Sequence, residues 1–195
     1  MKKKTLIISL IVLALCMPLF IKVYLTNKTY VSPEENWCDV GEGFEYEGMR
    51  YVLKDVEVFD AEQLADRLGI PKDNMAQVGT LAREKVKYFL MTTELTALKE
   101  DYVFDLSQMG MYTKYESGYT AEYNIVLNIN DSRVEKGLEV GESTEYYMVF
   151  KTSTLYYTEK GLAELDDNDI AMVMFDIENG RMNYLCKGGK LGMAD

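Results

Sequence analysis

The stretch VKYFLMTTELTA, residues Val86–Ala97, is the part of the sequence that most directly decides the fold. It is rich in aromatic and β-branched residues, which favour the pleated, half-buried surface of a β-sheet. Ile170–Ile177 is almost wholly apolar, as expected for a central strand that is buried on both faces. These two segments predict that the core of the protein is built mainly from strands.

Segments on both sides of this stretch alternate between apolar and polar residues. In Met49–Phe59, Met49, Tyr51 and Leu53 share one face, and the apolar set then switches to Val56 and Val58, which predicts a β-bulge. Glu178–Arg181 contains Asn-Gly, a strong signal for a type I′ hairpin turn. Further strands are predicted over residues 43–48, 123–129, 146–150 and 182–186.

One helix is clear in the sequence and follows the second predicted strand. Asp60 is a good N-cap with Gln63 three residues later, and Gly69 suits the position after the last turn. A second short helix is predicted, with weaker signals, over Tyr157–Leu165. About seven strands with one short helical insertion indicate an antiparallel β-sandwich rather than a parallel α/β sheet.

Four sequence features together resemble a known family. They are the strand Val86–Ala97, the segment Tyr102–Ser107 (YVFDLS), the turn Leu138–Ser143 (LEVGES) and the strand Tyr147–Phe150 (YMVF). This arrangement resembles the immunoglobulin-like (telokin-like) extracellular domains found in uncharacterised membrane-anchored proteins and lipoproteins of Gram-positive bacteria. That family has a proline where this chain has Val140. The resemblance implies an immunoglobulin-like sandwich outside the cell, and it implies no activity and no catalytic residues.

The N-terminal segment begins with Lys2 to Lys4 and continues as an apolar run, Thr5–Leu25, that holds one charge, Lys22. At about 1.5 Å per residue a helix over this run would span the hydrocarbon core of a membrane. Two alternatives remain open, a cleaved signal peptide and a lipoprotein signal ending at Cys16. We predict an uncleaved transmembrane helix over residues 1–25, a linker over 26–36 and an extracellular domain over 37–195. The lysines at the start favour a single-pass orientation at the cell membrane with the C-terminal domain outside.

The charge of the chain is uneven. Residues 1–28 contain five of the 21 basic residues and none of the 32 acidic residues, so the remainder carries 16 basic and 32 acidic side chains, a net charge of −16. Such a negative field opposes binding to nucleic acid and to anionic lipid headgroups. It is compatible with a solvated surface or with a basic partner.

The cysteine and histidine content limits the chemistry available. Cys38 and Cys186 lie near the two ends of the predicted domain and could pair as a disulfide, or could be two separate buried thiols. The sequence contains no histidine, which removes the commonest general base and the commonest metal ligand. We therefore expect no cofactor.

Two groups of residues are candidates for a binding site. An acidic loop before a strand has oxygen ligands that suit calcium, although it lacks the EF-hand pattern. A group of tyrosines could form an exposed aromatic platform for sugar or peptide, although half-buried strand positions also favour tyrosine. The acidic residues are Asp166, Asp167 and Asp169, and the tyrosines are Tyr112, Tyr115, Tyr119, Tyr156 and Tyr157.

The sequence predicts a membrane-tethered, non-catalytic module that binds a protein or a cell-wall component. The alternative is a small extracytoplasmic hydrolase or calcium-dependent enzyme that uses carboxylates. A deep cleft with carboxylates of perturbed pKa would favour the enzyme. A shallow surface with exposed aromatic side chains would favour the binding module.

Overall fold

The computed structural model describes most of the chain and divides it into two compact units, Met1–Glu34 and Glu35–Asp195. The described residues are 16–25, 33–71, 85–113, 117–120, 122–154, 157–176, 179–189 and 191.

In the first unit, residues 16–25 are helical and most of their side chains are exposed. No helix within the described residues is both long enough and apolar enough to cross a membrane. Residues 1–15 of the predicted transmembrane segment lie outside the described part of the chain.

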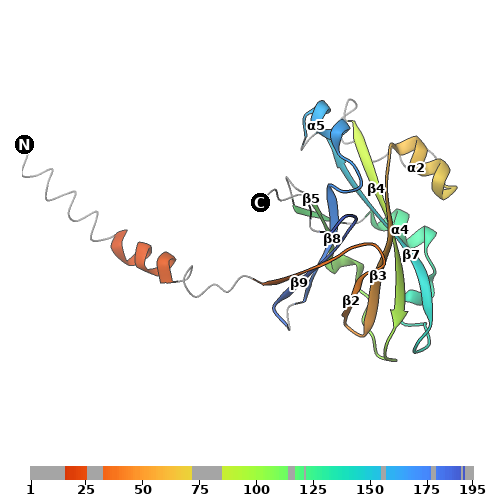
Figure 1. Ribbon diagram of the computed structural model, residues 1–195, viewed down its shortest axis with the longest axis horizontal. Helices are drawn as coiled ribbons and strands as arrows, with labels where there is room; N and C mark the ends of the chain where they lie inside the picture. Colours follow the sequence, from red (N-terminus) through yellow and green to blue (C-terminus); the bar gives the residue numbers. More distant parts are fainter. Residues whose placement is uncertain are drawn as a thin grey trace, which may run out of the picture. The chain divides into compact units, whose positions relative to one another are not determined.

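The second unit is mainly β, with two sheets and few helices (Figure 1). The five-stranded sheet has the order β1-β9-β8-β5-β6, and the four-stranded sheet has the order β2-β3-β4-β7. The strands are β1 (Glu34–Cys38), β2 (Gly43–Tyr46), β3 (Met49–Phe59), β4 (Val86–Ala97), β5 (Met109–Thr113), β6 (Ser117–Thr120), β7 (Ser143–Ser153), β8 (Ile170–Asp176) and β9 (Arg181–Cys186).

The long strands β3, β4 and β7 pair antiparallel and provide one half of the core. Their inward residues include Leu53, Met91, Met148 and Phe150, each fully buried. The register shifts between Leu53 and Asp55, which confirms the predicted bulge. The other half of the core comes from β5, β8 and β9, where alternate residues face the first sheet because side chains alternate along a strand.

Two helices cover the outer face of the four-stranded sheet: α2 (Ala61–Leu68), which contacts β3 and β4, and α4 (Tyr123–Ile129), which contacts β7. On β4, Tyr88 and Leu90 point away from the sandwich interior and are nevertheless fully buried. The described helices therefore protect this face from solvent. A third helix, α5 (Glu159–Glu164), precedes β8, and short 3₁₀ turns η1 (Leu106–Gln108) and η2 (Ser132–Val134) lie in the connections.

Helix α2 forms for the reasons visible in the sequence. The Asp60 carboxylate accepts from the Gln63 N–H at 2.8 Å, and the Gln63 side chain accepts from the Asp60 N–H at 3.0 Å. This is a complete capping box. Gly69 ends the helix with a φ of 67°, a conformation that glycine adopts without steric cost. The predicted helix is thus confirmed at both ends.

The prediction of a strand over residues 123–129 was wrong, because this segment is helix α4. Ile125 and Val126 are buried and Leu127 is 49% exposed. A strand would place Ile125 and Leu127 on the same face, whereas a helix separates them. The buried residues Ile125 and Val126 therefore belong to the face that α4 packs against β7.

The outer edge of strand β7 is hydrogen-bonded by the side chain of Asn130. The Asn130 amide donates to the Tyr147 carbonyl at 2.7 Å and accepts from the Tyr147 N–H at 2.7 Å. The Glu122 N–H donates to the Val149 carbonyl at 2.8 Å. These bonds occupy backbone groups that an exposed edge would offer to another chain.

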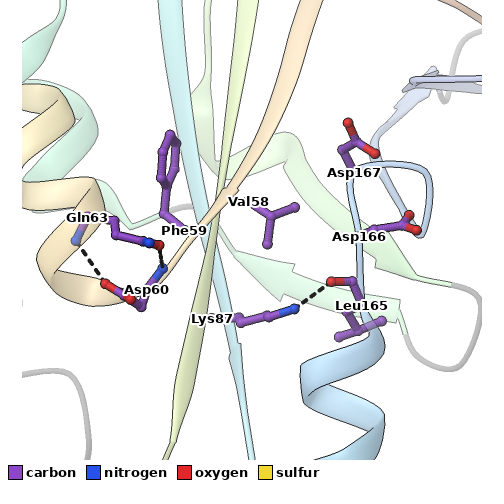
Figure 2. A pocket seen from close by; sticks show the side chains of 8 residues that line it. All are labelled: Val58, Phe59, Asp60, Gln63, Lys87, Leu165, Asp166 and Asp167. Atoms are coloured by element: carbon purple, nitrogen blue, oxygen red, sulfur yellow. Dashed lines mark hydrogen bonds between the residues drawn. The ribbon is translucent and has the colours of Figure 1, made fainter.

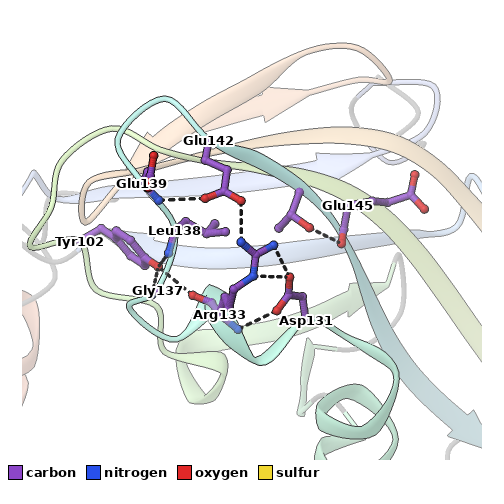
Figure 3. A network of polar contacts seen from close by, with 9 residues as sticks. Tyr102, Asp131, Arg133, Gly137, Leu138, Glu139, Glu142 and Glu145 are labelled. Atoms are coloured by element: carbon purple, nitrogen blue, oxygen red, sulfur yellow. Dashed lines mark hydrogen bonds and ion pairs between the residues drawn. The ribbon is translucent and has the colours of Figure 1, made fainter.

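Tyr102 holds together the loops at one end of the sandwich (Figure 3). Its side chain is buried, and its hydroxyl donates to the Arg133 carbonyl and accepts from the N–H groups of Gly137 and Leu138. Arg133 bonds Asp131 and Glu142 on the surface of the same loop, and the Arg133 hydrogen bond lowers the pKa of Asp131. The loop before β7 is therefore fixed from inside by the Tyr102 hydroxyl and from outside by an ion-pair network.

Candidate functional site

The predicted acidic loop lies between α5 and β8. The Asp166 carboxylate accepts from the Asn168 N–H at 2.9 Å, and the Asp169 carboxylate accepts from the Asp166 N–H at 3.1 Å. Asp167 is paired with the Lys187 ammonium at 2.5 Å. Within the described residues no group of three acidic or cysteine side chains has the geometry of a metal site. The carboxylates shape the loop and join it to β9.

A pocket of about 380 Å³ opens beside this loop, among the end of β3, the start of α2, the start of β4 and the segment that enters β8 (Figure 2). Its volume falls in the lower part of the range for small-molecule sites. Apolar and charged side chains both line it. The lining residues are Val58, Phe59, Asp60, Gln63, Lys87, Leu165, Asp166 and Asp167.

The polar groups of the pocket already have structural partners. The Lys87 ammonium donates to the carbonyl oxygens of Leu165 at 2.5 Å and Ala163 at 3.1 Å, which caps the end of α5. Burial lowers the pKa of Lys87, while the charges of Asp166 and Asp169 raise it. Asp60 caps α2. The arrangement can hold the two sheets and α5 together, and each of the three carboxylates that line the pocket makes a structural contact.

The predicted tyrosine platform is only partly brought together. Tyr157 is buried, and its hydroxyl shares a hydrogen bond with that of Thr113 at 2.6 Å, so it belongs to the interior. Tyr112 is half-buried on the outer face of the five-stranded sheet. Tyr115, Tyr156 and the side chain of Tyr119 lie outside the described part of the structure.

An aromatic and apolar surface is present on that outer face, and most of its members were not predicted. Trp37 of β1 stacks on Tyr184 of β9 with ring centroids 3.9 Å apart and an interplanar angle of 4°. Tyr112 of β5 meets Tyr184 edge-on at 5.8 Å. We call this surface the aromatic face; it comprises Trp37, Tyr112, Val173, Phe175, Met182 and Tyr184.

The strand register determines how these side chains are arranged. Phe175 lies opposite Met182, and Val173 lies opposite Tyr184. On its other side Val173 lies opposite Gly110, which has no side chain. Val173 therefore lies between Tyr184 and a position without a side chain. Phe175, two residues further along β8, is 42% exposed.

Glu35 is the charged side chain that adjoins the aromatic face from β1. Its carboxylate accepts from the Trp37 indole N–H at 3.0 Å. Burial, and then the charges of Glu35 and Tyr112, raise the pKa of Tyr184 to about 12, so this phenol remains neutral at physiological pH. The Tyr184 hydroxyl contacts the Met182 sulfur at 3.5 Å.

Part of the aromatic face could be recognised from the alternation of residues in the sequence. Met182, Tyr184 and Cys186 alternate along one strand, and Val173 and Phe175 alternate within the apolar segment 170–177. The alternation does not reveal which set faces the second sheet. Trp37 lies at the boundary between the predicted linker and domain, where no pattern marked a strand; β1 in fact begins at Glu34, inside the predicted linker.

Cys38 and Cys186 are free thiols, so the disulfide that we considered is not formed in this structure. Cys38 ends β1 and Cys186 ends β9, and these two strands are neighbours in the five-stranded sheet. Residue numbers increase in the same direction along both strands, as in a parallel pair, as shown by the contacts Asn36–Asn183, Trp37–Tyr184 and Asp39–Gly188.

The two thiols nevertheless belong to different clusters. Cys38 lies in the main core, and Cys186 lies in the cluster that includes Tyr184 of the aromatic face. They therefore point to opposite faces of one sheet, which separates their sulfur atoms. Burial raises the pKa of both thiols, that of Cys186 to about 12, which makes them unreactive.

Comparison of the chain with protein-family models, with curated proteins and with solved structures gives no match.

Proposed function

We propose that the protein is a non-catalytic binding module that recognises a protein or cell-envelope ligand through the aromatic face. The observation that carries this proposal is the group of Trp37, Tyr112 and Phe175 on the outer face of the five-stranded sheet, where Trp37 and Tyr112 pack on the buried ring of Tyr184. The four-stranded sheet differs, since α2 and α4 cover its outer face. Aromatic side chains presented together on a rigid sheet are typical of protein interfaces.

The proposed fold is an immunoglobulin-like sandwich. The neighbour orders β7-β4-β3 and β6-β5-β8-β9 correspond to the E-B-A and C′-C-F-G orders of immunoglobulin domains. The chain changes sheet after β1, β4, β6 and β7, and the last three changes are those that a Greek-key connection requires. The short strands β1 and β2 are not part of this correspondence. These orders support the telokin-like family that the sequence resembles.

The proposed location is outside the cell membrane, with residues 1–25 as a single-pass anchor. The support is the apolar run Thr5–Leu25 behind three lysines. The intact mass of the protein extracted from membranes tests this location. A mature chain that begins with a lipid-modified Cys16, or beyond Leu25, would replace the anchor with a lipoprotein or a cleaved signal.

A carboxylate-based hydrolase or calcium-dependent enzyme could use the pocket of Figure 2, which is lined by three carboxylates. There Asp60 is a helix cap, Asp166 accepts a loop N–H and Asp167 is paired with Lys187. No described observation assigns these carboxylates to a reaction. The binding module is therefore the function that the described geometry supports best.

Site-specific photo-crosslinking in the native cell tests the binding function. A benzophenone amino acid replaces Phe175, and in a matched control it replaces Leu127, an exposed apolar residue of α4. We expect a discrete adduct from position 175 that is absent from position 127. An absence of adducts at position 175, or equal adducts at both positions, would contradict the proposal.

A further inference from the structure

We propose that the partner of the aromatic face is a basic protein segment that carries an exposed apolar side chain. This inference rests on the proposed binding function and specifies the chemistry of the partner. It follows from the composition of the face, from its shape and from the charge around it.

The composition of the face favours a peptide over a sugar. Its described strand positions on β5, β8 and β9 are Gly110, Tyr112, Ala171, Val173, Phe175, Met182, Tyr184 and Cys186. A glycan needs several hydrogen-bonding groups beside the aromatic rings, because its hydroxyl groups lose water on binding. Here the Tyr184 hydroxyl is directed to a sulfur atom and the Glu35 carboxylate to Trp37. Apolar contact is what this surface chiefly offers.

The shape of the face fits a single apolar side chain. Val173 lies opposite Gly110, which has no side chain, and Phe175 follows on the same face and is 42% exposed. Positions two residues apart on a strand are separated by about 6.6–6.8 Å. A leucine, methionine or phenylalanine side chain can therefore contact Val173 and Phe175 together.

Charge complementarity selects a basic partner. The chain beyond residue 28 carries a net charge of −16, and Glu35 places a carboxylate beside Trp37 at the margin of the aromatic face. None of the described side chains that form this face is basic. A cationic segment would be attracted over roughly a Debye length, about 8 Å at physiological salt. A second copy of this chain would bring the same negative charge and would be repelled.

Trp37 makes the proposal directly measurable, because it is the only tryptophan in the chain. Its stacking on Tyr184 places this single fluorophore in the proposed site. The full chain, held in a zwitterionic detergent, is titrated with a short synthetic peptide of alternating lysine and leucine. Matched peptides replace lysine with glutamate or leucine with serine, and a soluble chito-oligosaccharide serves as the glycan probe.

We expect the lysine–leucine peptide to change the Trp37 fluorescence saturably, and each replaced peptide to bind more weakly. Raising the salt from about 0.1 M to about 1 M shortens the Debye length from about 10 Å to about 3 Å and should weaken binding markedly. Phe175→Ser should weaken binding about tenfold, as expected for an interface anchor. Leu127→Ser, on helix α4 beside the four-stranded sheet, should leave binding unchanged.

A second pair of variants isolates the charge. Glu35→Gln keeps an acceptor for the Trp37 indole and removes the negative charge, so binding should weaken and depend less on salt. Glu100→Gln removes an equal charge from an exposed loop before Tyr102 and should have a much smaller effect.

Three outcomes would overturn the inference. If the glutamate peptide or the oligosaccharide binds better than the lysine–leucine peptide, and does so through Phe175, the face is a binding site with a different partner. If the lysine–leucine peptide binds equally to the wild type and to Phe175→Ser, the aromatic face is not its site. If no probe changes the fluorescence, the basic partner is rejected, and the crosslinking at position 175 decides separately whether a binding function remains.

Discussion

Tyr102→Phe is the substitution whose effect on stability can best be worked out from the structure. The Tyr102 ring is buried, and its hydroxyl bonds the Arg133 carbonyl at 3.2 Å and the N–H groups of Gly137 and Leu138 at 2.9 and 3.1 Å. Phenylalanine keeps the ring and removes only these three bonds. The experiment therefore isolates the contribution of one buried hydroxyl.

Removal of the Tyr102 hydroxyl affects its three hydrogen-bond partners unequally. The Gly137 N–H and the Arg133 carbonyl also bond each other at 2.6 Å, so both retain a partner. The N–H of Leu138, a buried residue, has Tyr102 as its described acceptor. Leaving one buried N–H unsatisfied costs about 1–3 kcal/mol, so we expect the free energy of unfolding to fall by about 2 kcal/mol.

Urea unfolding followed by circular dichroism measures this change directly. For a unit of the size of Glu35–Asp195, about 2 kcal/mol corresponds to a fall in Tm of about 4–8 °C. Tyr46→Phe is the matched control, because its hydroxyl bonds Gln108 at 2.6 Å in an exposed position; it should change stability by less than about 0.5 kcal/mol. Equal effects of the two substitutions would refute the reasoning.

Asp60→Ala removes the capping box of α2 and should lower the free energy of unfolding by about 0.5–2 kcal/mol, measured with urea; an unchanged midpoint would contradict this. Asn130→Ala exposes the N–H and carbonyl of Tyr147 at the edge of β7, so light scattering should detect increased aggregation, and an unchanged signal would oppose the proposed edge protection. Stability should also fall in alkaline solution. The folded-state pKa values of Cys186 and Tyr184 are raised to about 12 from 9.0 and 10.0, so unfolding releases protons above about pH 9 and stability declines from there to about pH 12. Cys186→Ala should make this decline shallower, and an identical pH profile would show that the thiol contributes nothing.

Much of the local structure could be read from the sequence. Val86–Ala97 is strand β4 with the predicted bounds, and Met49–Phe59 is strand β3 with its bulge. The short helix predicted near Glu159 is present as α5. Gly141 has the positive φ, 87°, that its predicted turn requires. These features depend on residues adjacent in the chain, so local patterns contain the necessary information.

Some local predictions needed correction because the decisive contact is distant. The hairpin after β8 forms, and its last described pair is Asp176–Arg181, whereas the predicted turn would have paired Glu178 with Arg181. Residues 177 and 178 lie outside the described part of the chain. Phe175, expected to be buried within a central strand, is 42% exposed. The described chain has nine strands rather than about seven, because β1 and the short strands β5 and β6 were not predicted, while the predicted strand 123–129 is helix α4.

The sequence by itself determined that this chain has an apolar N-terminal segment, an acidic remainder and a mainly β domain. Composition and short-range periodicity are sufficient for these conclusions. Only the tertiary structure decided that α4 is a helix, that Cys38 and Cys186 face opposite sides of a sheet, and that Trp37 meets Tyr184. The reason is physical: alternation divides a strand into two faces, but the packing of distant strands decides which face is covered and which side chains meet there.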